Sequence, residues 1–222
     1  MGHQVKLSDQ KKEWFKRGKL KARPHETRAI RERILIVCEG SKTEPNYFKS
    51  INNALPPNVV EISVEGEGFN TQSLVNRAKE YRDQKANSDY PYDETWVVFD
   101  KDSFGADQFD NAIHSAEAAG IKVAWSNEAF ELWYILHFEA RQTGMSRSEY
   151  SGCLATHLAS PYKKNDPDMY SKLQALGDED QARERAKSLQ DVHADVTSHS
   201  ANPCTCVNKL VEKLNTFKPI TK

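Results

Sequence analysis

The chain has 222 residues and a mass of 25.3 kDa, with 38% hydrophobic and 28% charged residues and a formal net charge of -1. This length favours one α/β domain with an appendage over two full domains, and the apolar content excludes a wholly disordered chain. No apolar run approaches the roughly 18 residues of a membrane span, and the N-terminus lacks an apolar signal core, so we expect a cytoplasmic protein that does not enter membranes.

The charge is distributed unevenly along the chain. The first 33 residues contain 11 Lys and Arg against 4 Asp and Glu, a charge of +7, whereas the remainder contains 20 against 28, a charge of -8. We therefore expect residues 1–32 to form a basic, flexible N-terminal arm. Such an arm is typical of a tether to a polyanion, because each cation placed on a phosphate releases counterions. A solvated leader that only keeps the chain in solution is the alternative.

Strand and helix patterns alternate over residues 33–140, which we expect to form an α/β domain. Apolar runs predict strands at 34–38, 59–64, 96–99 and 121–125. Helical spacing predicts a helix that includes Tyr47 and Phe48, and further helices over 71–85, 106–119 and 128–138, with Gly120 as a left-handed stop. The connections are too long for hairpins, so we expect a mainly parallel four-stranded sheet flanked by helices, with right-handed crossovers.

The strand pattern disappears after residue 140. Helical patterns over 148–159, 166–175, 179–191 and 205–215 predict a helical C-terminal extension, residues 141–222, that packs on the α/β domain. The four cysteines lack the spaced pairs of a secreted scaffold, so we expect free thiols.

Acidic residues follow the predicted strands. Glu39 ends the first strand, Asp100 and Asp102 end the third, and Glu131 lies on the helix after the fourth. Ligand sites of parallel α/β sheets lie at the carboxyl ends of the strands. Carboxylates that converge there repel one another unless a divalent cation lies between them, and such hard oxygen ligands suit Mg²⁺ or Mn²⁺. A helix cap or a solvated turn is the alternative for any one of them.

Several motifs resemble a known family. Residues 34–48, I-L-I-V-C-E-G-S-K-T-E-P-N-Y-F, with F-D-K-D at 99–102, look like a Toprim domain. The same start, with the S-N-x-x-F-E-L-W-x-x-L-H-F stretch from Ser126, Tyr162-Lys163-Lys164 and N-P-x-T at 202–205, is similar to the RloB-like, AbiLii-type proteins of bacterial restriction and abortive-infection loci. The resemblance covers about residues 33–215.

This resemblance implies a Mg²⁺- or Mn²⁺-dependent nuclease in anti-phage defence, acting on DNA or RNA. Glu39 matches the Toprim glutamate, assigned acid/base or metal duty, and Asp100 and Asp102 match its metal-binding pair. Glu131 matches the family's F-E-x-W segment and would complete a second metal position, as in OLD-type nucleases. From chemistry alone, Lys164, ahead of Lys42 and Lys163, is the lysine that could neutralise substrate phosphate, and an ordinary surface lysine is the alternative. A partner protein or phage trigger from a defence locus and a homo-oligomer are compatible with this interpretation.

Other candidates are weaker. For Glu44 and Glu128 we favour first-turn carboxylates that interact with a helix dipole. Gly66-Glu67-Gly68 lacks the third glycine of a dinucleotide fingerprint, and we interpret His137 as a hydrogen-bonded structural histidine. A zinc site of His199, Cys204 and Cys206 lacks a second ligand pair. An aspartyl-phosphate phosphatase fits poorly, because Ser-Phe follows Asp102.

Two other function classes stay open at this point. The acidic residues could hold an ion structurally in a nucleic-acid-binding or regulatory protein, or the enzyme could act on nucleotides. Metal-dependent turnover that is lost on substitution of Glu39 would separate the first alternative from a nuclease, and product analysis would separate the second. The choice of substrate, the trigger and the oligomeric state are not determined by the sequence.

Overall fold

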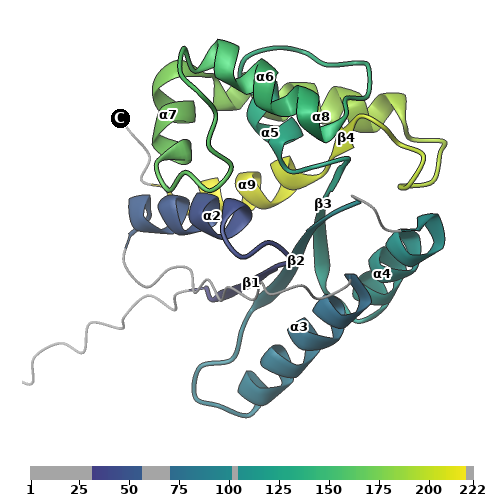
Figure 1. The fold of residues 1–222 in the computed structure, drawn as a ribbon. Helices are drawn as coiled ribbons and strands as arrows, with labels where there is room; N and C mark the ends of the chain where they lie inside the picture. The colour runs from purple at the N-terminus through teal and green to yellow at the C-terminus, as the bar shows by residue number, and fades with distance from the viewer. Residues whose placement is uncertain (1–31, 57–70, 102–104, 219–222) are drawn as a thin grey trace, which may run out of the picture. The chain divides into compact units, whose positions relative to one another are not determined.

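The computed structural model describes residues 32–56, 71–101 and 105–218. A four-stranded sheet lies at the centre of the fold (Figure 1). Its strands, in spatial order, are β1 (Ile34–Cys38), β2 (Glu94–Asp100), β3 (Lys122–Asn127) and β4 (Cys204–Thr205). The first three strands are parallel, and β4 pairs antiparallel with β3. The expected α/β architecture with a mostly parallel sheet flanked by helices is therefore confirmed.

Eight helices are described in residues 32–218. They are α2 (Thr43–Ala54), α3 (Thr71–Ala86), α4 (Ala106–Ala118), α5 (Glu131–Leu136), α6 (Arg147–His157), α7 (Met169–Leu176), α8 (Glu179–Val192) and α9 (Val207–Asn215). Helices α3 and α4 pack together on one side of the sheet, and α2, α5 and α9 lie on the other (Figure 1). None of these described helices combines the length and the apolar character needed to cross a membrane.

Burial explains why the strands could be found from the sequence. All five residues of β1 are buried, as are the last six residues of β2, because helices cover both faces of the sheet. The predicted stop of the helix before β3 is also confirmed, since Gly120 has a φ of 69° two residues after the end of α4. All four cysteines are free thiols, as expected.

Strand β4 was not predicted from the sequence. The run 59–64 lies outside the described residues, and the strand beside β3 is instead β4, so the expectation of no strand after residue 140 is wrong. This strand has only two residues, and polar contacts to β3 hold it. Ser126 Oγ lies 2.9 Å from Thr205 Oγ1, and the Cys206 N–H donates to the carbonyl of Trp125 at 2.8 Å. So short a strand has no apolar periodicity, and its second residue, Thr205, was predicted as the start of the last helix.

Helix α5 is shorter than the predicted 128–138. At its N-terminal end the N–H of Leu132 bonds to the carbonyl of Ala129, and beyond its C-terminal end the N–H of His137 bonds to that of Tyr134. These bonds reach three residues back, the tighter pattern that is common at helix ends. Glu128 therefore lies in the bend before α5 rather than in its first turn.

A buried aromatic cluster joins α2, α5 and α7. The ring of Tyr47 lies 5.6 Å from that of Phe130, 5.7 Å from Tyr134 and 5.4 Å from Tyr170. The indole N–H of Trp133 donates to the Tyr47 hydroxyl at 2.8 Å. The pairs with Phe130 and Tyr170 are edge-on, and such pairs contribute about 0.5–1.5 kcal/mol each beyond their burial. The cluster therefore fixes α5, and the carboxylate that begins it, against α2.

The predicted N-terminal arm lies outside the described residues, apart from Glu32, whose carboxylate binds Lys213 of α9. The described residues belong to one compact unit, residues 32–222.

Candidate functional site

Glu39 and Asp100 lie side by side at the carboxyl edge of the sheet. Asp100 is the last residue of β2, and Glu39 follows β1 with its N–H bonded to the carbonyl of Val98 at 2.9 Å. The Glu39 carboxylate accepts a hydrogen bond from the Asp100 N–H at 3.3 Å. Because β1 and β2 are parallel neighbours, their two ends meet at one edge. The structure thus brings two of the predicted site residues together.

Asp100 carries a buried carboxylate with incomplete pairing. Its Oδ1 has no hydrogen-bond partner, and Oδ2 lies 3.9 Å from the guanidinium of Arg147 on α6. Burial raises the pKa of Asp100 well above its usual range, and the neighbouring charges of Glu44 and Glu131 raise it further. A buried oxygen without a partner, surrounded by like charges, is the environment that a cation would stabilise.

Glu131 begins α5 and is also buried, with 7% of its surface exposed. The Tyr162 hydroxyl donates to its Oε1 at 3.0 Å. Burial raises the pKa of Tyr162, and the charge of Glu131 raises it further, so Tyr162 stays a protonated donor. The negative charge of Glu131 also acts on Asp100 and Glu44, which places these carboxylates in one electrostatic environment.

Glu44 belongs to this environment, although the sequence analysis favoured a helix-dipole role for it. It does lie in the first turn of α2, but only 5% of it is exposed. Burial raises its pKa, and the charge of Glu131 raises it further. Its carboxylate folds back over Gly40, where an added Cβ would stand 2.7 Å from Glu44 Cδ. The sequence signal was the second acidic residue of E-G-S-K-T-E. We call Glu39, Glu44, Asp100 and Glu131 the acidic cluster.

Of the remaining predicted site residues, Asp102 lies outside the described residues and Lys164 is exposed on the loop before α7. The positive charge of Lys164 lowers the pKa of Glu44, so it acts on the acidic cluster. Arg147 has the same effect on Glu44 and was missed by the sequence analysis, because nothing in the pattern of α6 distinguishes it from a surface arginine.

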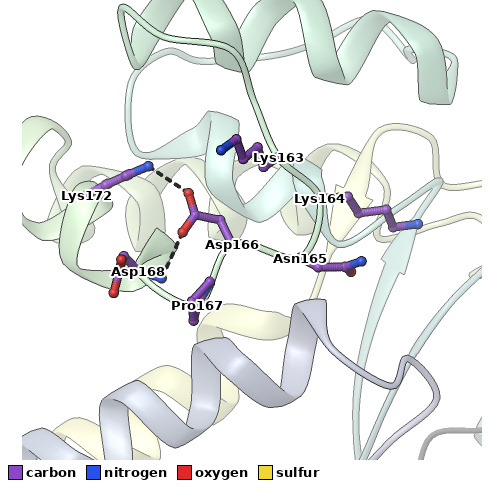
Figure 2. A pocket seen from close by; sticks show the side chains of 7 residues that line it. All are labelled: Lys163, Lys164, Asn165, Asp166, Pro167, Asp168 and Lys172. Carbon is purple, nitrogen blue, oxygen red and sulfur yellow. Dashed lines mark hydrogen bonds and ion pairs between the residues drawn. The ribbon is translucent and has the colours of Figure 1, made fainter.

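The loop that carries Lys164 is tied to α2. The Thr43 hydroxyl donates to the Lys164 carbonyl at 2.9 Å, the Asn46 amide to the Asn165 carbonyl at 3.4 Å, and the Ser50 hydroxyl to the Pro167 carbonyl at 3.4 Å. Figure 2 shows this segment around a cavity of about 510 Å³. The residues that line the cavity are Lys163, Lys164, Asn165, Asp166, Pro167, Asp168 and Lys172. The loop is therefore fixed beside the helix that bears Glu44, with Lys163 and Lys164 exposed on it.

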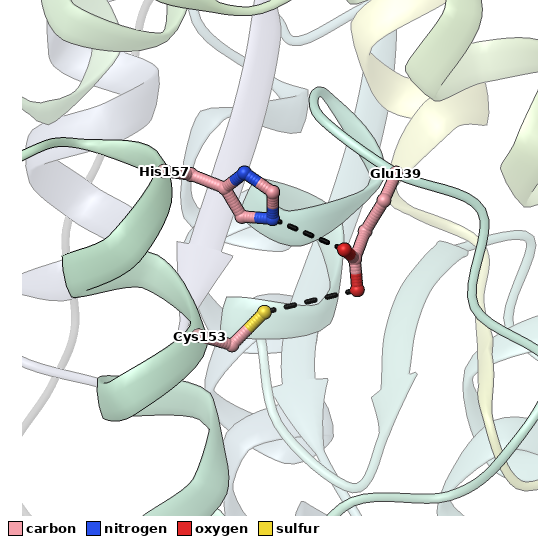
Figure 3. Close-up of side chains that lie close together, drawn as sticks. All are labelled: Glu139, Cys153 and His157. Carbon is pink, nitrogen blue, oxygen red and sulfur yellow. Dashed lines mark hydrogen bonds and ion pairs between the residues drawn. The ribbon is translucent and has the colours of Figure 1, made fainter.

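The carboxylate oxygens of the acidic cluster do not form a group in which at least three ligand atoms all lie within 4.8 Å of one another. Among the described residues, the only group of three or more His, Cys, Asp and Glu whose ligand atoms all lie within 4.8 Å of one another is Glu139, Cys153 and His157 (Figure 3). This group could hold a metal ion, and it lies outside the acidic cluster. The sequence analysis missed it, although Cys153 and His157 are spaced four residues apart on a predicted helix.

The weaker candidates have structural partners. His137 is buried, its Nδ1 lies 2.9 Å from the Trp133 carbonyl oxygen, and burial lowers its pKa to about 4. His199 Nδ1 lies 2.6 Å from Asp110 Oδ2. Burial raises the pKa of Cys204 to about 12, which disfavours a thiolate there. These contacts support the structural interpretation of both histidines.

Comparison with known families gives one match. The chain matches a family described as RloB-like protein over residues 34–214, which is most of its length. The comparisons with curated proteins and with solved structures gave no significant match. The matched range begins with β1 and ends in α9, so it includes the whole acidic cluster and Lys164.

Proposed function

The chain belongs to the RloB-like protein family, and on that premise we propose that it is a Mg²⁺- or Mn²⁺-dependent nuclease that cleaves phosphodiester bonds of DNA or RNA. The observation that carries the proposal is the buried, unpartnered Oδ1 of Asp100 among three other carboxylates. The Toprim-type roles and the place in anti-phage defence come from the resemblance of the sequence motifs, and the cytoplasmic location stays the expectation of the sequence analysis.

The donor set fits a hard divalent cation. All members of the acidic cluster offer carboxylate oxygens, which Mg²⁺ and Mn²⁺ prefer, and none offers sulfur or imidazole. Burial is the main cause of the raised pKa values of Asp100 and Glu44, and repulsion from neighbouring carboxylates raises them further; a cation would relieve that repulsion. We assign Glu39, Asp100 and Glu131 as ligands, with Asp102 assigned from the sequence alone, and add Glu44. Bound there, an ion would polarise the scissile phosphate and lower the pKa of an attacking water.

Three residues in or around the acidic cluster have further roles in the proposed reaction. Glu39, fixed by its hydrogen bond from the Asp100 N–H, is the carboxylate placed to accept a proton from the attacking water. Tyr162 holds Glu131 in position through its hydroxyl and is a positioning residue. Arg147 offsets part of the negative charge around Asp100 when no cation is bound.

Lys164 and Lys163 are the groups that we assign to the nucleic-acid backbone. Both are exposed, and the bonds from α2 hold their loop at the edge of the acidic cluster. A lysine at a phosphate contributes binding that weakens with salt, because counterions are released on contact. The basic residues 1–32 would add further contacts to phosphates of the nucleic acid.

The test is cleavage of end-labelled single-stranded DNA, double-stranded DNA, tRNA and mRNA by the full chain over a series of Mg²⁺ and Mn²⁺ concentrations. We expect at least one of these substrates to be cut only when metal is present. Glu39→Gln and Asp100→Asn should remove the activity. Glu117→Gln is the matched control, because it makes the same chemical change at an exposed position on α4 and should cut like the wild type.

The outcomes separate the function classes. Cleavage that persists in Glu39→Gln and Asp100→Asn would overturn the site assignment. Metal-dependent binding to these polymers without cleavage would overturn the nuclease proposal in favour of a nucleic-acid-binding or regulatory protein. Turnover of free nucleotides in place of polymers would identify an enzyme of nucleotide chemistry.

A further inference from the structure

We propose that Glu139, Cys153 and His157 form a Zn²⁺ site, separate from the acidic cluster. Glu139 follows α5, while Cys153 and His157 lie on α6 (Figure 3). His157 Nε2 is 3.2 Å from Glu139 Oε2, and Cys153 Sγ is 3.8 Å from Glu139 Oε1. The three ligand atoms lie within 4.8 Å of one another.

These spacings agree with a zinc coordination sphere. Zinc bonds of about 2.3 Å to sulfur and about 2.0–2.1 Å to nitrogen or oxygen, at tetrahedral angles, place neighbouring ligand atoms about 3.3–3.6 Å apart. The two measured distances to Glu139 lie close to this range. Because the three ligand atoms lie within 4.8 Å of one another, their convergence on one ion requires shifts of at most about 1 Å and a turn of the Glu139 carboxylate that brings one oxygen to both partners.

Two of the ligands are already held in place. Cys153 and His157 are four residues apart on α6, so their side chains share one face of the helix. The His157 ring stacks on that of Phe138, with centroids 4.8 Å apart and planes 3° from parallel. Helix α6 begins with a capping box of Ser146 and Glu149. Binding of Zn²⁺ therefore requires little further ordering of the side chains of Cys153 and His157.

The ligand types select zinc over the hard cations proposed for the acidic cluster. Sulfur and imidazole nitrogen suit a borderline-soft ion, whereas Mg²⁺ favours oxygen alone. With thiolate and carboxylate bound, the two negative charges neutralise Zn²⁺, and the thiol proton is released to solvent. The side chains of Glu139 and His157 are 36% and 25% exposed, so a water can complete the tetrahedron.

Arg141 competes for the same carboxylate. Its Nη1 lies 3.5 Å from Glu139 Oε1, and its Nε bonds to the sulfur of Met145 at 3.0 Å. This half-buried pair is long for an ion pair, and zinc, with two positive charges, can displace the arginine from Glu139. It follows that Arg141→Gln should bind zinc more tightly than the wild type.

The experiment is a titration of the metal-free full chain with Zn²⁺ against a chromophoric chelator, and a parallel titration with Co²⁺. We expect a site whose Co²⁺ spectrum contains a thiolate-to-cobalt charge-transfer band, distinct from any binding of these ions by the carboxylates of the acidic cluster. Cys153→Ser should abolish the band and weaken Zn²⁺ binding by more than the about 10–100-fold that loss of an outer-sphere partner costs. His157→Ala should also weaken binding, with circular dichroism confirming that both variants are folded.

Two control variants make the outcome decisive. Ser151→Ala changes an exposed residue of the same helix, and Asp100→Asn changes the acidic cluster, so both should retain the band and the affinity. A Co²⁺ spectrum without a thiolate band, or equal Zn²⁺ affinity in the wild type and Cys153→Ser, would overturn the proposal. Loss of zinc binding in Asp100→Asn with retention in Cys153→Ser would assign the ion to the acidic cluster and would also overturn it.

Discussion

The carboxylate of Glu44 lies over Gly40, in space that the side chain of any other residue at position 40 would occupy. An added Cβ there would stand 2.7 Å from Glu44 Cδ and closer still to Oε2. The requirement for glycine is one of space, since the φ of Gly40 is not in the left-handed region. The turn after β1 is therefore shaped to let Glu44 reach the acidic cluster.

Gly40→Ala should displace Glu44 without unfolding the chain, because the clashing atoms are the end of a flexible side chain. We expect metal-dependent cleavage to fall by on the order of 100-fold, the usual effect of a misplaced site group, with an increased requirement for Mn²⁺. The control is Gly152→Ala in α6, where an added Cβ meets no atom within 4 Å and should stabilise the fold by about 0.5–1 kcal/mol. Unchanged metal dependence in Gly40→Ala would remove Glu44 from the cluster.

Asp100→Asn should stabilise the metal-free protein while removing its function. The raised pKa means that the folded state binds a proton more tightly than the unfolded state, so Asp100 lowers stability as pH rises from its unfolded pKa through its folded one. At neutral pH the substitution should add about 0.5–2 kcal/mol, or several degrees in Tm. Adding Mn²⁺ should raise the Tm of the wild type but not of the variant. A lower Tm in metal-free Asp100→Asn would contradict this account.

Glu131→Gln keeps the shape of the side chain and removes its charge. If Glu131 is a metal ligand, this change should lower the cleavage activity by orders of magnitude and raise the metal concentration that is required, while the protein stays folded. Tyr162→Phe removes only the hydrogen bond to Glu131, so it should raise the metal requirement yet recover activity at saturating Mg²⁺. Rates for both variants across a Mg²⁺ series check this. Near-wild-type activity of Glu131→Gln at low Mg²⁺ would exclude it as a ligand.

His137 should make the fold sensitive to mild acid. Its pKa of about 4 in the folded state lies below the usual value of about 6.5, so the unfolded chain takes up the proton first as pH falls. Stability should therefore decline between pH 6.5 and pH 4, by about 3 kcal/mol from this residue. The repulsion at Asp100 acts in the opposite direction, so the comparison is between the wild type and His137→Gln. Urea unfolding at pH 7 and pH 5 should show a smaller decline in the variant.

Most of the sheet could be predicted because its buried strands have apolar sequences. The runs 34–38 and 96–99, which became β1 and most of β2, are apolar throughout, as strands covered on both faces require, and the run 121–125, which overlaps β3, is apolar except for the exposed Lys122. The short β4 could not be predicted, since its pairing depends on Ser126 and Thr205 meeting across 79 residues of sequence. Helix ends were also shifted, because the tighter hydrogen bonds that flank α5 depend on tertiary packing and not on periodicity.

The acidic cluster was foreseen in part for a similar reason. Parallel strand ends share an edge, so Glu39 and Asp100 could be paired from topology alone. Glu44 looked like an ordinary first-turn carboxylate, because its burial arises from the fold of the turn over Gly40. Arg147 and Tyr162 belong to segments far from the strands in sequence, and only packing of the C-terminal helices brings them to Asp100 and Glu131.

The antiparallel pairing of β4 with β3 has a consequence for synthesis on the ribosome. Among the described residues, the edge of β3 that faces away from β2 is paired only by Cys204 and Thr205, and α9, which packs on β3, follows them in the chain. The cluster also needs Tyr162 and Arg147, so a nascent chain that ends before these helices lacks an assembled site. At about 5–20 residues per second, translation leaves the sheet unfinished for several seconds after Glu131 is added. Hydrolytic activity would thus be withheld from unfinished chains and would arise only once synthesis is nearly complete.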